Sequence, residues 1–169
     1  MIHVCSITKV AQAVEQSGGS RLVTLLTAGT PFERPAAIDP ANHLFLSMND
    51  IVQEQDGMVL PGREHVETML EFARAWDRTT PLVIHCFAGI SRSTAAAYIC
   101  AAALAPGRDE AELARTLRRL SPSATPNARL VRHGDAILGR NGRMVAAIES
   151  IGRGADAFEG APFFLPIDA

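Results

Sequence analysis

Three residues with chemically useful side chains, Cys86, Arg92 and Ser93, lie close together near the middle of the chain, with Gly89 between them. An apolar run precedes Cys86 and an alanine-rich stretch follows Ser93, which predicts a turn from a buried strand into a helix. The N–H groups of this turn, the positive end of the helix and Arg92 would favour a thiolate on Cys86, although a free cysteine has a pKa of roughly 8.5. The same groups would bind a tetrahedral dianion. The spacing therefore predicts nucleophilic displacement at phosphorus.

Other residues of this stretch have predicted supporting roles. Gly89 lets the backbone turn where a Cβ would clash. The Ser93 hydroxyl is expected to donate to the Cys86 sulfur, which would help the sulfur leave when a covalent intermediate breaks down. His85 is expected to fix the loop through hydrogen bonds and not to act as a base, because the nucleophile is already ionised. The residues expected to bind the phosphate are Phe87, Ala88, Gly89, Ile90, Ser91 and Arg92.

The leaving oxygen of a phosphate ester needs a proton donor from a separate segment. Asp50 is the first candidate, because it follows a predicted strand, 43–48, and so belongs to the same sheet edge as Cys86. An aspartate in this role must be protonated at the working pH, which predicts burial on substrate binding and an acidic pH optimum. Asp56, farther along the same polar segment, is the alternative donor.

The run His-Cys-Phe-Ala-Gly-Ile-Ser-Arg-Ser at residues 85–93 resembles the HCxxGxxRS motif of the cysteine-based protein tyrosine phosphatases. Its Ala-Gly-x-Ser-Arg-Ser portion is more similar to the dual-specificity branch, in the form of a small bacterial-type phosphatase, than to the receptor-type branch. The similarity extends from about residue 43 to residue 138. It implies that Asp50 is the general acid and that Asn127, in a Pro-Asn pair, supports the phosphate loop.

The resemblance also implies a mechanism and a substrate. Cys86 would attack phosphorus and form a phosphocysteine while Asp50 protonates the leaving oxygen, and Asp50 would then activate the water that hydrolyses this intermediate. Neither a metal nor another cofactor is implied. The expected partners are phosphorylated proteins or peptides. Phosphotyrosine is the first expected substrate, with phosphoserine and phosphothreonine left open because the sequence shows no tyrosine-recognition loop.

Two other functions stay open. A phosphatase for a non-protein phosphate ester would need a deep basic pocket, which the apolar loop residues Phe87, Ala88 and Ile90 do not favour. A non-catalytic phosphate-binding domain or a rhodanese-like domain would keep the cysteine, but it would not need Arg92 and Ser93 together with a candidate acid.

The composition is that of an ordinary globular protein, since 47% of the 169 residues are hydrophobic and 20% are charged. A net charge of −2 argues against nucleic acid or a membrane surface as a partner. The three cysteines lack metal-binding spacing and the N-terminus lacks signal-peptide features, so a cytoplasmic location is expected. A reversible disulfide between Cys5 and Cys86 stays open, because the first strand should end beside Cys86. The oligomeric state is not predicted.

Short apolar runs alternate with amphipathic stretches along the chain, which predicts an α/β fold. We expect a central, mostly parallel sheet of four to five strands flanked by helices, with the phosphate loop between a central strand and a helix. Residues 1–169 are expected to form a single domain, with a tail of about residues 153–169 docked on the core. His43 and His65 are expected to be solvated at element ends. The predicted strands are 2–7, 21–27, 43–48 and 82–86, and the predicted helices are 9–16, 63–77, 93–105, 109–120, 127–138 and 143–151.

Overall fold

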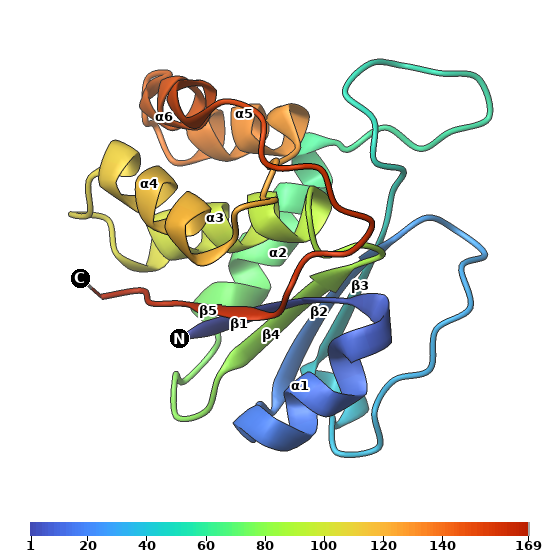
Figure 1. Ribbon diagram of the computed structural model, residues 1–169. Helices are drawn as coiled ribbons and strands as arrows, with labels where there is room; N and C mark the ends of the chain where they lie inside the picture. The colour runs from blue at the N-terminus through green and yellow to red at the C-terminus, as the bar shows by residue number, and fades with distance from the viewer. Residues whose placement is uncertain (169) are drawn as a thin grey trace.

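The computed structural model describes residues 1–168, and these contain a five-stranded sheet in the order β3-β2-β4-β1-β5 (Figure 1). The first four strands are parallel to one another, and β5 runs antiparallel to β1. The predicted α/β fold with a mostly parallel sheet is therefore confirmed. The strands are β1 (Ile2–Ser6), β2 (Arg21–Leu26), β3 (His43–Ser47), β4 (Leu82–Cys86) and β5 (Phe163–Leu165).

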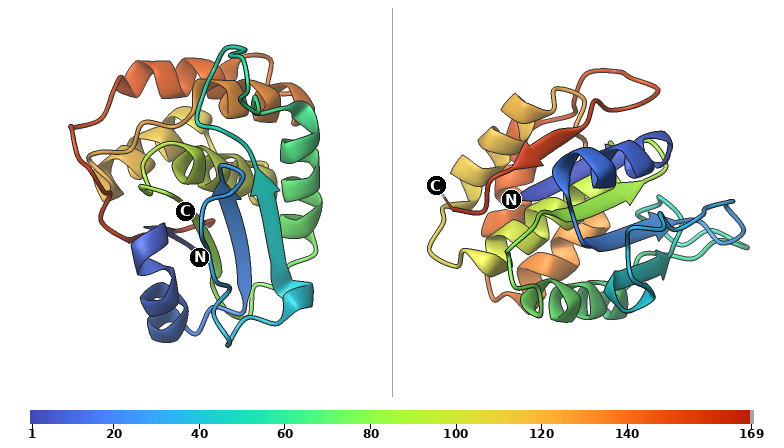
Figure 2. Two further views of the ribbon diagram at one scale, coloured as in Figure 1. Left: turned by 90° about the vertical axis from the view of Figure 1, so that its right-hand side faces the viewer. Right: turned by 90° about the horizontal axis from the view of Figure 1, so that it is seen from below.

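Helices cover both faces of this sheet (Figure 2). On one face, α1 (Val10–Ser17) packs over a small apolar cluster that includes Cys5 and Val83. The larger core lies on the opposite face, between the sheet and five helices. These helices are α2 (Arg63–Arg74), α3 (Arg92–Leu104), α4 (Glu110–Leu120), α5 (Ala128–Ile137) and α6 (Arg143–Ile151), and short 3-10 turns occur at Ile7–Lys9 and Pro40–Asn42.

The central strand and the central helix are joined directly by the loop 87–91. β4 lies between β2 and β1, and all five of its residues are buried. α3 is buried along nearly its whole length, because its many alanines let the sheet and the neighbouring helices approach closely. The loop therefore lies at the carboxyl edge of the parallel strands, where ligands bind in open α/β sheets.

The sequence pattern misses β5, although it assigns these residues to a docked tail. Phe163–Leu165 pair with β1, with Leu165 opposite Ile2 and Phe163 opposite Val4. A strand of three residues is too short for alternation to distinguish it from an irregular docked segment. The predicted helix 63–77 ends earlier, at Arg74. Ala169, the last residue of the predicted tail, lies outside the described residues.

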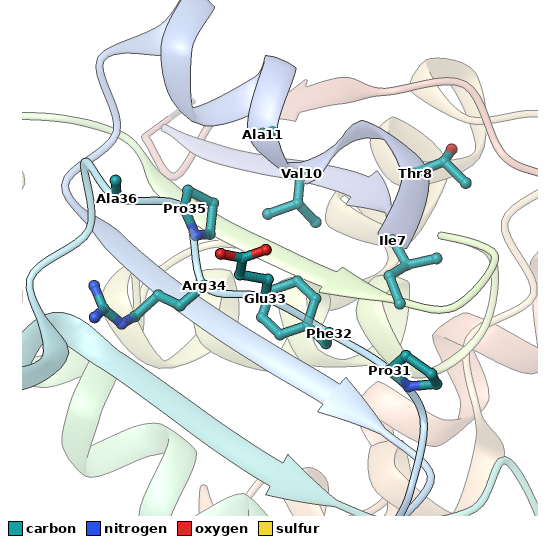
Figure 3. Close-up of a pocket in the computed structure, with 10 residues that line it drawn as sticks. All are labelled: Ile7, Thr8, Val10, Ala11, Pro31, Phe32, Glu33, Arg34, Pro35 and Ala36. Atoms are coloured by element: carbon teal, nitrogen blue, oxygen red, sulfur yellow. The ribbon is translucent and has the colours of Figure 1, made fainter.

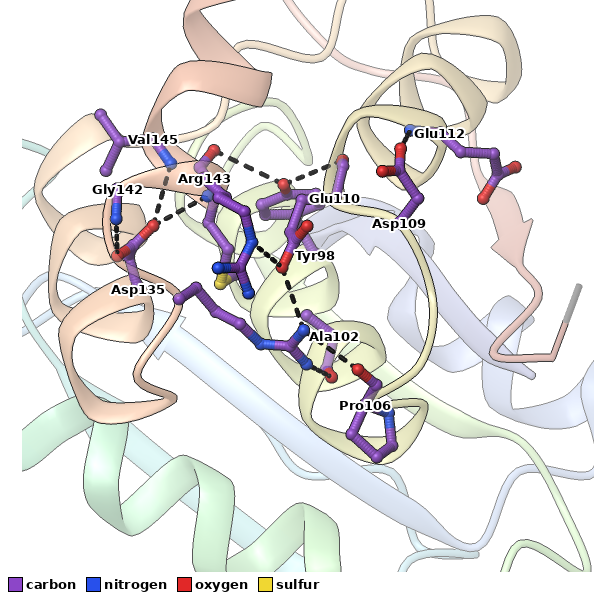
Figure 4. A network of polar contacts seen from close by, with 12 residues as sticks. Tyr98, Ala102, Pro106, Asp109, Glu110, Glu112, Asp135, Gly142, Arg143 and Val145 are labelled. Carbon is purple, nitrogen blue, oxygen red and sulfur yellow. Dashed lines mark hydrogen bonds and ion pairs between the residues drawn. The ribbon is translucent and has the colours of Figure 1, made fainter.

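A buried polar network fastens α6 to the helices beside it (Figure 4). Arg140, just before α6, forms an ion pair with Glu110 of α4 at 3.0 Å, and the two side chains are only 10% and 9% exposed. Asp135 of α5 caps α6 by accepting hydrogen bonds from the amides of Gly142, Met144 and Val145. This network fixes where α6 begins and how the helix is placed against α4 and α5.

Candidate active site

The loop 87–91 is held by donors that lie outside it. Four of its five backbone carbonyl groups accept hydrogen bonds from amides of other segments. These bonds are Ile7 N to Phe87 O (3.0 Å), Gly160 N to Ala88 O (2.8 Å), Thr125 N to Ile90 O (3.0 Å) and Asn127 N to Ser91 O (3.2 Å). Carbonyls that bond outward leave the loop's N–H groups available for a ligand in its centre. The loop is thus shaped as an anion cradle before substrate arrives.

Gly89 occupies the one loop position where a side chain has no room. Its φ is +72°, in the left-handed region that favours glycine. A Cβ there would lie 2.9 Å from the carbonyl carbon of Cys5 and 2.9 Å from the amide nitrogen of Ser6. The loop can therefore pack against the end of β1 only with glycine at this position.

Cys86, the predicted nucleophile, is 2% exposed at the end of β4. Its sulfur lies 3.1 Å from the Ser93 hydroxyl oxygen and 3.3 Å from the amide nitrogen of Gly89, which donates to it. Both groups stand at or near the N-terminal end of α3, where the helix dipole favours negative charge. This arrangement suits a sulfur that carries negative charge.

Arg92, the predicted phosphate clamp, is held firmly and keeps donors free. Its Nη1 donates to the Met48 carbonyl at 2.7 Å and to the Thr27 hydroxyl at 3.3 Å. The side chain is 7% exposed, and its buried Nε has no hydrogen-bond partner within residues 1–168. Met48 and Thr27 follow the ends of β3 and β2, so two strand ends aim the guanidinium at the loop.

His85 lies under the loop as a neutral ring. Its Nδ1 is 3.1 Å from the Cys86 carbonyl oxygen, and its Nε2 is 2.8 Å from the Thr24 hydroxyl. Burial is the main cause that lowers the pKa of His85 to about 4, and nearby His43 and Arg92 lower it further. A neutral His85 fits the predicted supporting role and does not fit a role as a cationic partner of the thiolate.

His43 differs from its expected solvated state. Its Nε2 lies 2.8 Å from the same Thr24 hydroxyl, and its ring packs beside Phe32. Phe32 also lies over His85, with ring centroids 4.7 Å apart. The expectation fails because an element-end position says nothing about a neighbouring strand, and Thr24 on β2 bridges the two histidines.

Asp50, the predicted proton donor, is tied to the loop. Its Oδ1 accepts hydrogen bonds from the Ser91 hydroxyl at 2.7 Å and from Asn127 Nδ2 at 2.8 Å. Asn127 also caps α5, since its side-chain oxygen accepts from the amides of Arg129 and Leu130. Asp56 is exposed, and no hydrogen bond joins its side chain to the loop in the described chain. The contacts therefore bring Asp50 and Asn127 to the loop and leave Asp56 outside.

The geometry argues against a disulfide between Cys5 and Cys86. In the parallel register of β1 and β4, Cys5 lies opposite His85 and Ser6 lies opposite Cys86. Because side chains alternate between the faces of a strand, Cys5 points to the α1 face and Cys86 to the opposite face. Thiols on opposite faces cannot bond without backbone movement. Burial also raises the pKa of Cys5 to about 12, which makes it a poor nucleophile.

Two hollows flank Asp50. One has a volume of about 230 Å³ and lies between the loop and residues 153–157. The other, of about 420 Å³, lies between residues 51–55 on one side and Ser91 with residues 125–128 on the other. A further hollow of about 430 Å³ lies between Ile7–Ala11 and Pro31–Ala36, and none of the predicted site residues lines it (Figure 3). Asp50 therefore borders two hollows, and a leaving group that takes a proton from it can extend into either.

Within residues 1–168 there is no group of three or more His, Cys, Asp or Glu side chains that could hold a metal ion. In the same range, no helix has the combined length and hydrophobicity needed to cross a bilayer.

Several supports of the site carry no sequence signal of their own. Thr24 on β2, and Thr27 and Met48 directly after β2 and β3, act through a side chain or a carbonyl at positions that look like ordinary core. Gly160 holds the loop through its amide, a group that every residue except proline possesses. The one signal that could have identified Thr27 and Met48 is their position, because both directly follow parallel strands whose carboxyl ends meet at the site.

No protein-family model matches the chain, and no curated protein matches it in sequence. Solved structures do match it. The structure of DUSP15 superposes with a TM-score of 0.62 at 15% identity, covering 87% of this chain and 89% of that chain. The structure of human DUSP28 superposes with a TM-score of 0.60 at 17% identity, covering 81% of this chain and 93% of that chain. The structure of the PTP-2 phosphatase of Cydia pomonella superposes with a TM-score of 0.61 at 17% identity, covering 79% of this chain and 83% of that chain. The chain therefore has the fold of the dual-specificity and protein tyrosine phosphatases.

Proposed function

We propose that the protein hydrolyses phosphate monoesters of phosphorylated proteins through a phosphocysteine intermediate. Phosphotyrosine is the first proposed substrate, with phosphoserine and phosphothreonine included. The observation that carries the proposal is the convergence on one loop of a buried cysteine, a hydroxyl and an amide within hydrogen-bond distance of its sulfur, and a clamped arginine. The match in fold to dual-specificity and tyrosine phosphatases supports it.

In the first step, the Cys86 thiolate attacks phosphorus and the bond from phosphorus to the ester oxygen breaks. The loop N–H groups and Arg92 hold the non-bridging oxygens, where negative charge lies in the transition state. Asp50 gives its proton to the leaving oxygen. Because Ser91 and Asn127 both donate to Oδ1 of Asp50, Oδ2 is the oxygen that carries this proton.

In the second step, water attacks the phosphocysteine and Asp50 takes a proton from it. The bond from sulfur to phosphorus breaks, and Cys86 leaves as a thiolate while inorganic phosphate is released. The Ser93 hydroxyl, 3.1 Å from the sulfur, stabilises the charge that returns there. Ser93 therefore serves the breakdown of the intermediate more than its formation.

The test measures turnover of p-nitrophenyl phosphate and of a phosphotyrosine peptide. Wild type should hydrolyse both, Cys86→Ser neither, and Ser93→Ala should accumulate phosphoenzyme that is detectable by mass spectrometry. Asp50→Asn should slow hydrolysis of the peptide more than hydrolysis of p-nitrophenyl phosphate, because p-nitrophenolate leaves without a proton. A wild-type protein that hydrolyses no phosphate monoester would overturn the proposal.

A further inference from the structure

The segment 153–160, which we call the C-terminal strap, runs beside the phosphate loop (Figure 1). Three of its amides donate hydrogen bonds to the loop or to the segment before α5. The bonds are Gly154 N to Thr125 Oγ1 (3.1 Å), Ala155 N to Pro122 O (2.9 Å) and Gly160 N to Ala88 O (2.8 Å). The strap is therefore attached at both of its ends.

The attachment is close enough to make the strap a fixed wall. A Cβ on Gly154 would lie 2.5 Å from the Ser123 carbonyl, and a Cβ on Gly160 would lie 2.7 Å from the Gly89 carbonyl oxygen. Arg118 of α4 holds the chain just before the strap, donating to the carbonyls of Ile151 (2.6 Å) and Gly152 (2.7 Å).

A hollow of about 230 Å³ separates this wall from the candidate acid. Asp50, Ile90 and Ser91 line one side of it, and residues 153–157 line the other. A general acid must lie within hydrogen-bond reach of the oxygen that it protonates. The part of a substrate that surrounds this oxygen can extend into this hollow or into the larger one on the other side of Asp50, and only this hollow is lined by a cationic side chain within the described residues.

Arg153 is the only cationic side chain among the described residues that line this hollow. Its Nη2 pairs with Asp156 at 2.6 Å, and the two side chains are 76% and 83% exposed. Such an exposed pair is weak, and a guanidinium has further N–H donors for a second carboxylate. The acidic residues that line the hollow together with Arg153 are Asp156 and Asp50, and Asp50 is neutral when it acts as the acid.

We propose that the C-terminal strap is a substrate-recognition wall on which Arg153 binds an acidic side chain beside the phosphorylated residue. The inference rests on the proposed phosphatase function and names its substrate class, an acidic phosphopeptide. Asp156 competes with the substrate carboxylate for Arg153 and limits the preference.

The test compares kcat/KM for phosphotyrosine peptides that carry Glu or Gln at the three positions on either side of the phosphorylated residue. The ratio of the Glu to the Gln value should be about three to five in wild type, the size expected for an exposed charge pair. It should fall to about one in Arg153→Gln, drop below one in Arg153→Glu and rise in Asp156→Asn. The matched control is Arg132→Gln, an exposed arginine on α5, which should keep the wild-type ratio.

A wild-type ratio near one, or an unchanged ratio in Arg153→Gln, would overturn the subsite and leave the phosphatase proposal standing. Failure of wild type to hydrolyse any of the peptides or p-nitrophenyl phosphate would instead overturn the phosphatase proposal, and the subsite with it. Because the Glu and Gln peptides are compared on the same variant, a general loss of activity in that variant lowers both values and leaves their ratio unchanged.

Discussion

The proton positions beneath the loop follow from one carbonyl group. The Cys86 carbonyl can only accept, so a neutral His85 must carry its proton on Nδ1 and accept at Nε2. The Thr24 hydroxyl must then donate to His85, which leaves its oxygen to accept from Nε2 of His43. A single directed chain thus runs from β3 through β2 to the residue that carries the nucleophile.

Replacing Thr24 by valine should break this chain. The two ring nitrogens that Thr24 serves would lose their partner, and a buried polar group without a partner costs about 1–3 kcal/mol. We expect a lower free energy of unfolding in urea and a lower kcat, because His85 would no longer be fixed. Thr24→Ser keeps the hydroxyl and should recover both quantities. A valine variant as stable and as active as the serine variant would show that the chain has no such role.

His85 also predicts a pH dependence of stability. Its pKa is about 4 in the folded protein and near 6.5 when unfolded, so between these values the unfolded chain binds the proton first. Stability should fall as the pH drops from 6.5 toward 4, by on the order of 3 kcal/mol from this residue. The free energy of unfolding of His85→Gln should decline less over this range. Parallel curves for the variant and wild type would contradict the assignment.

At the scale of elements, the parts predicted from sequence are those with a local pattern. The apolar run 82–86, the glycine-containing turn and the alanine-rich stretch predict β4, the loop and α3, because burial on both sides leaves no polar face. Asp50 is predicted from its place after a strand, and Asn127 is implied by the resemblance of its Pro-Asn pair to the phosphatase family. The strap and β5 have no local pattern, since their positions depend on hydrogen bonds from their backbone to the Thr125 hydroxyl, the Ala88 carbonyl and β1.

Gly160→Ala tests the contact between the strap and the loop. The added Cβ would lie 2.7 Å from the Gly89 carbonyl oxygen, so the loop must shift. We expect a fall in kcat of at least about tenfold and weaker competitive inhibition by inorganic phosphate, since strain of about 1–3 kcal/mol is typical of such overpacking. Gly107→Ala is the matched control, because a Cβ there meets no atom within 4 Å. If Gly160→Ala and Gly107→Ala had equal inhibition constants for inorganic phosphate, the contact between the strap and the loop would have no role in phosphate binding.

At the scale of the whole molecule, the site depends on α4 and α6, which contribute none of the site residues described above. The loop is held by the strap, the strap begins where α6 ends, and α6 is fastened by Asp135 and by the pair of Arg140 and Glu110 (Figure 4). Arg140 also donates to the carbonyls of Ala102 and Pro106, at 2.9 Å and 3.0 Å. A buried arginine with several acceptors orients the elements that it joins, whatever its net contribution to stability.

Arg140→Met should therefore destabilise the fold by about 2–4 kcal/mol, because it leaves Glu110 and two carbonyls without this donor. Arg143 lies 3.2 Å from the same carboxylate and still pairs with it, so the loss of stability should be smaller than for a buried charge without any partner. Removing the charge as well, in Arg140→Met with Glu110→Met, should restore part of the stability. The exposed pair of Arg63 and Glu67 is the control, and Arg63→Met should cost less than about 1 kcal/mol in the same urea titration. If Arg140→Met cost no more than Arg63→Met, the network would not be what holds α6 in place.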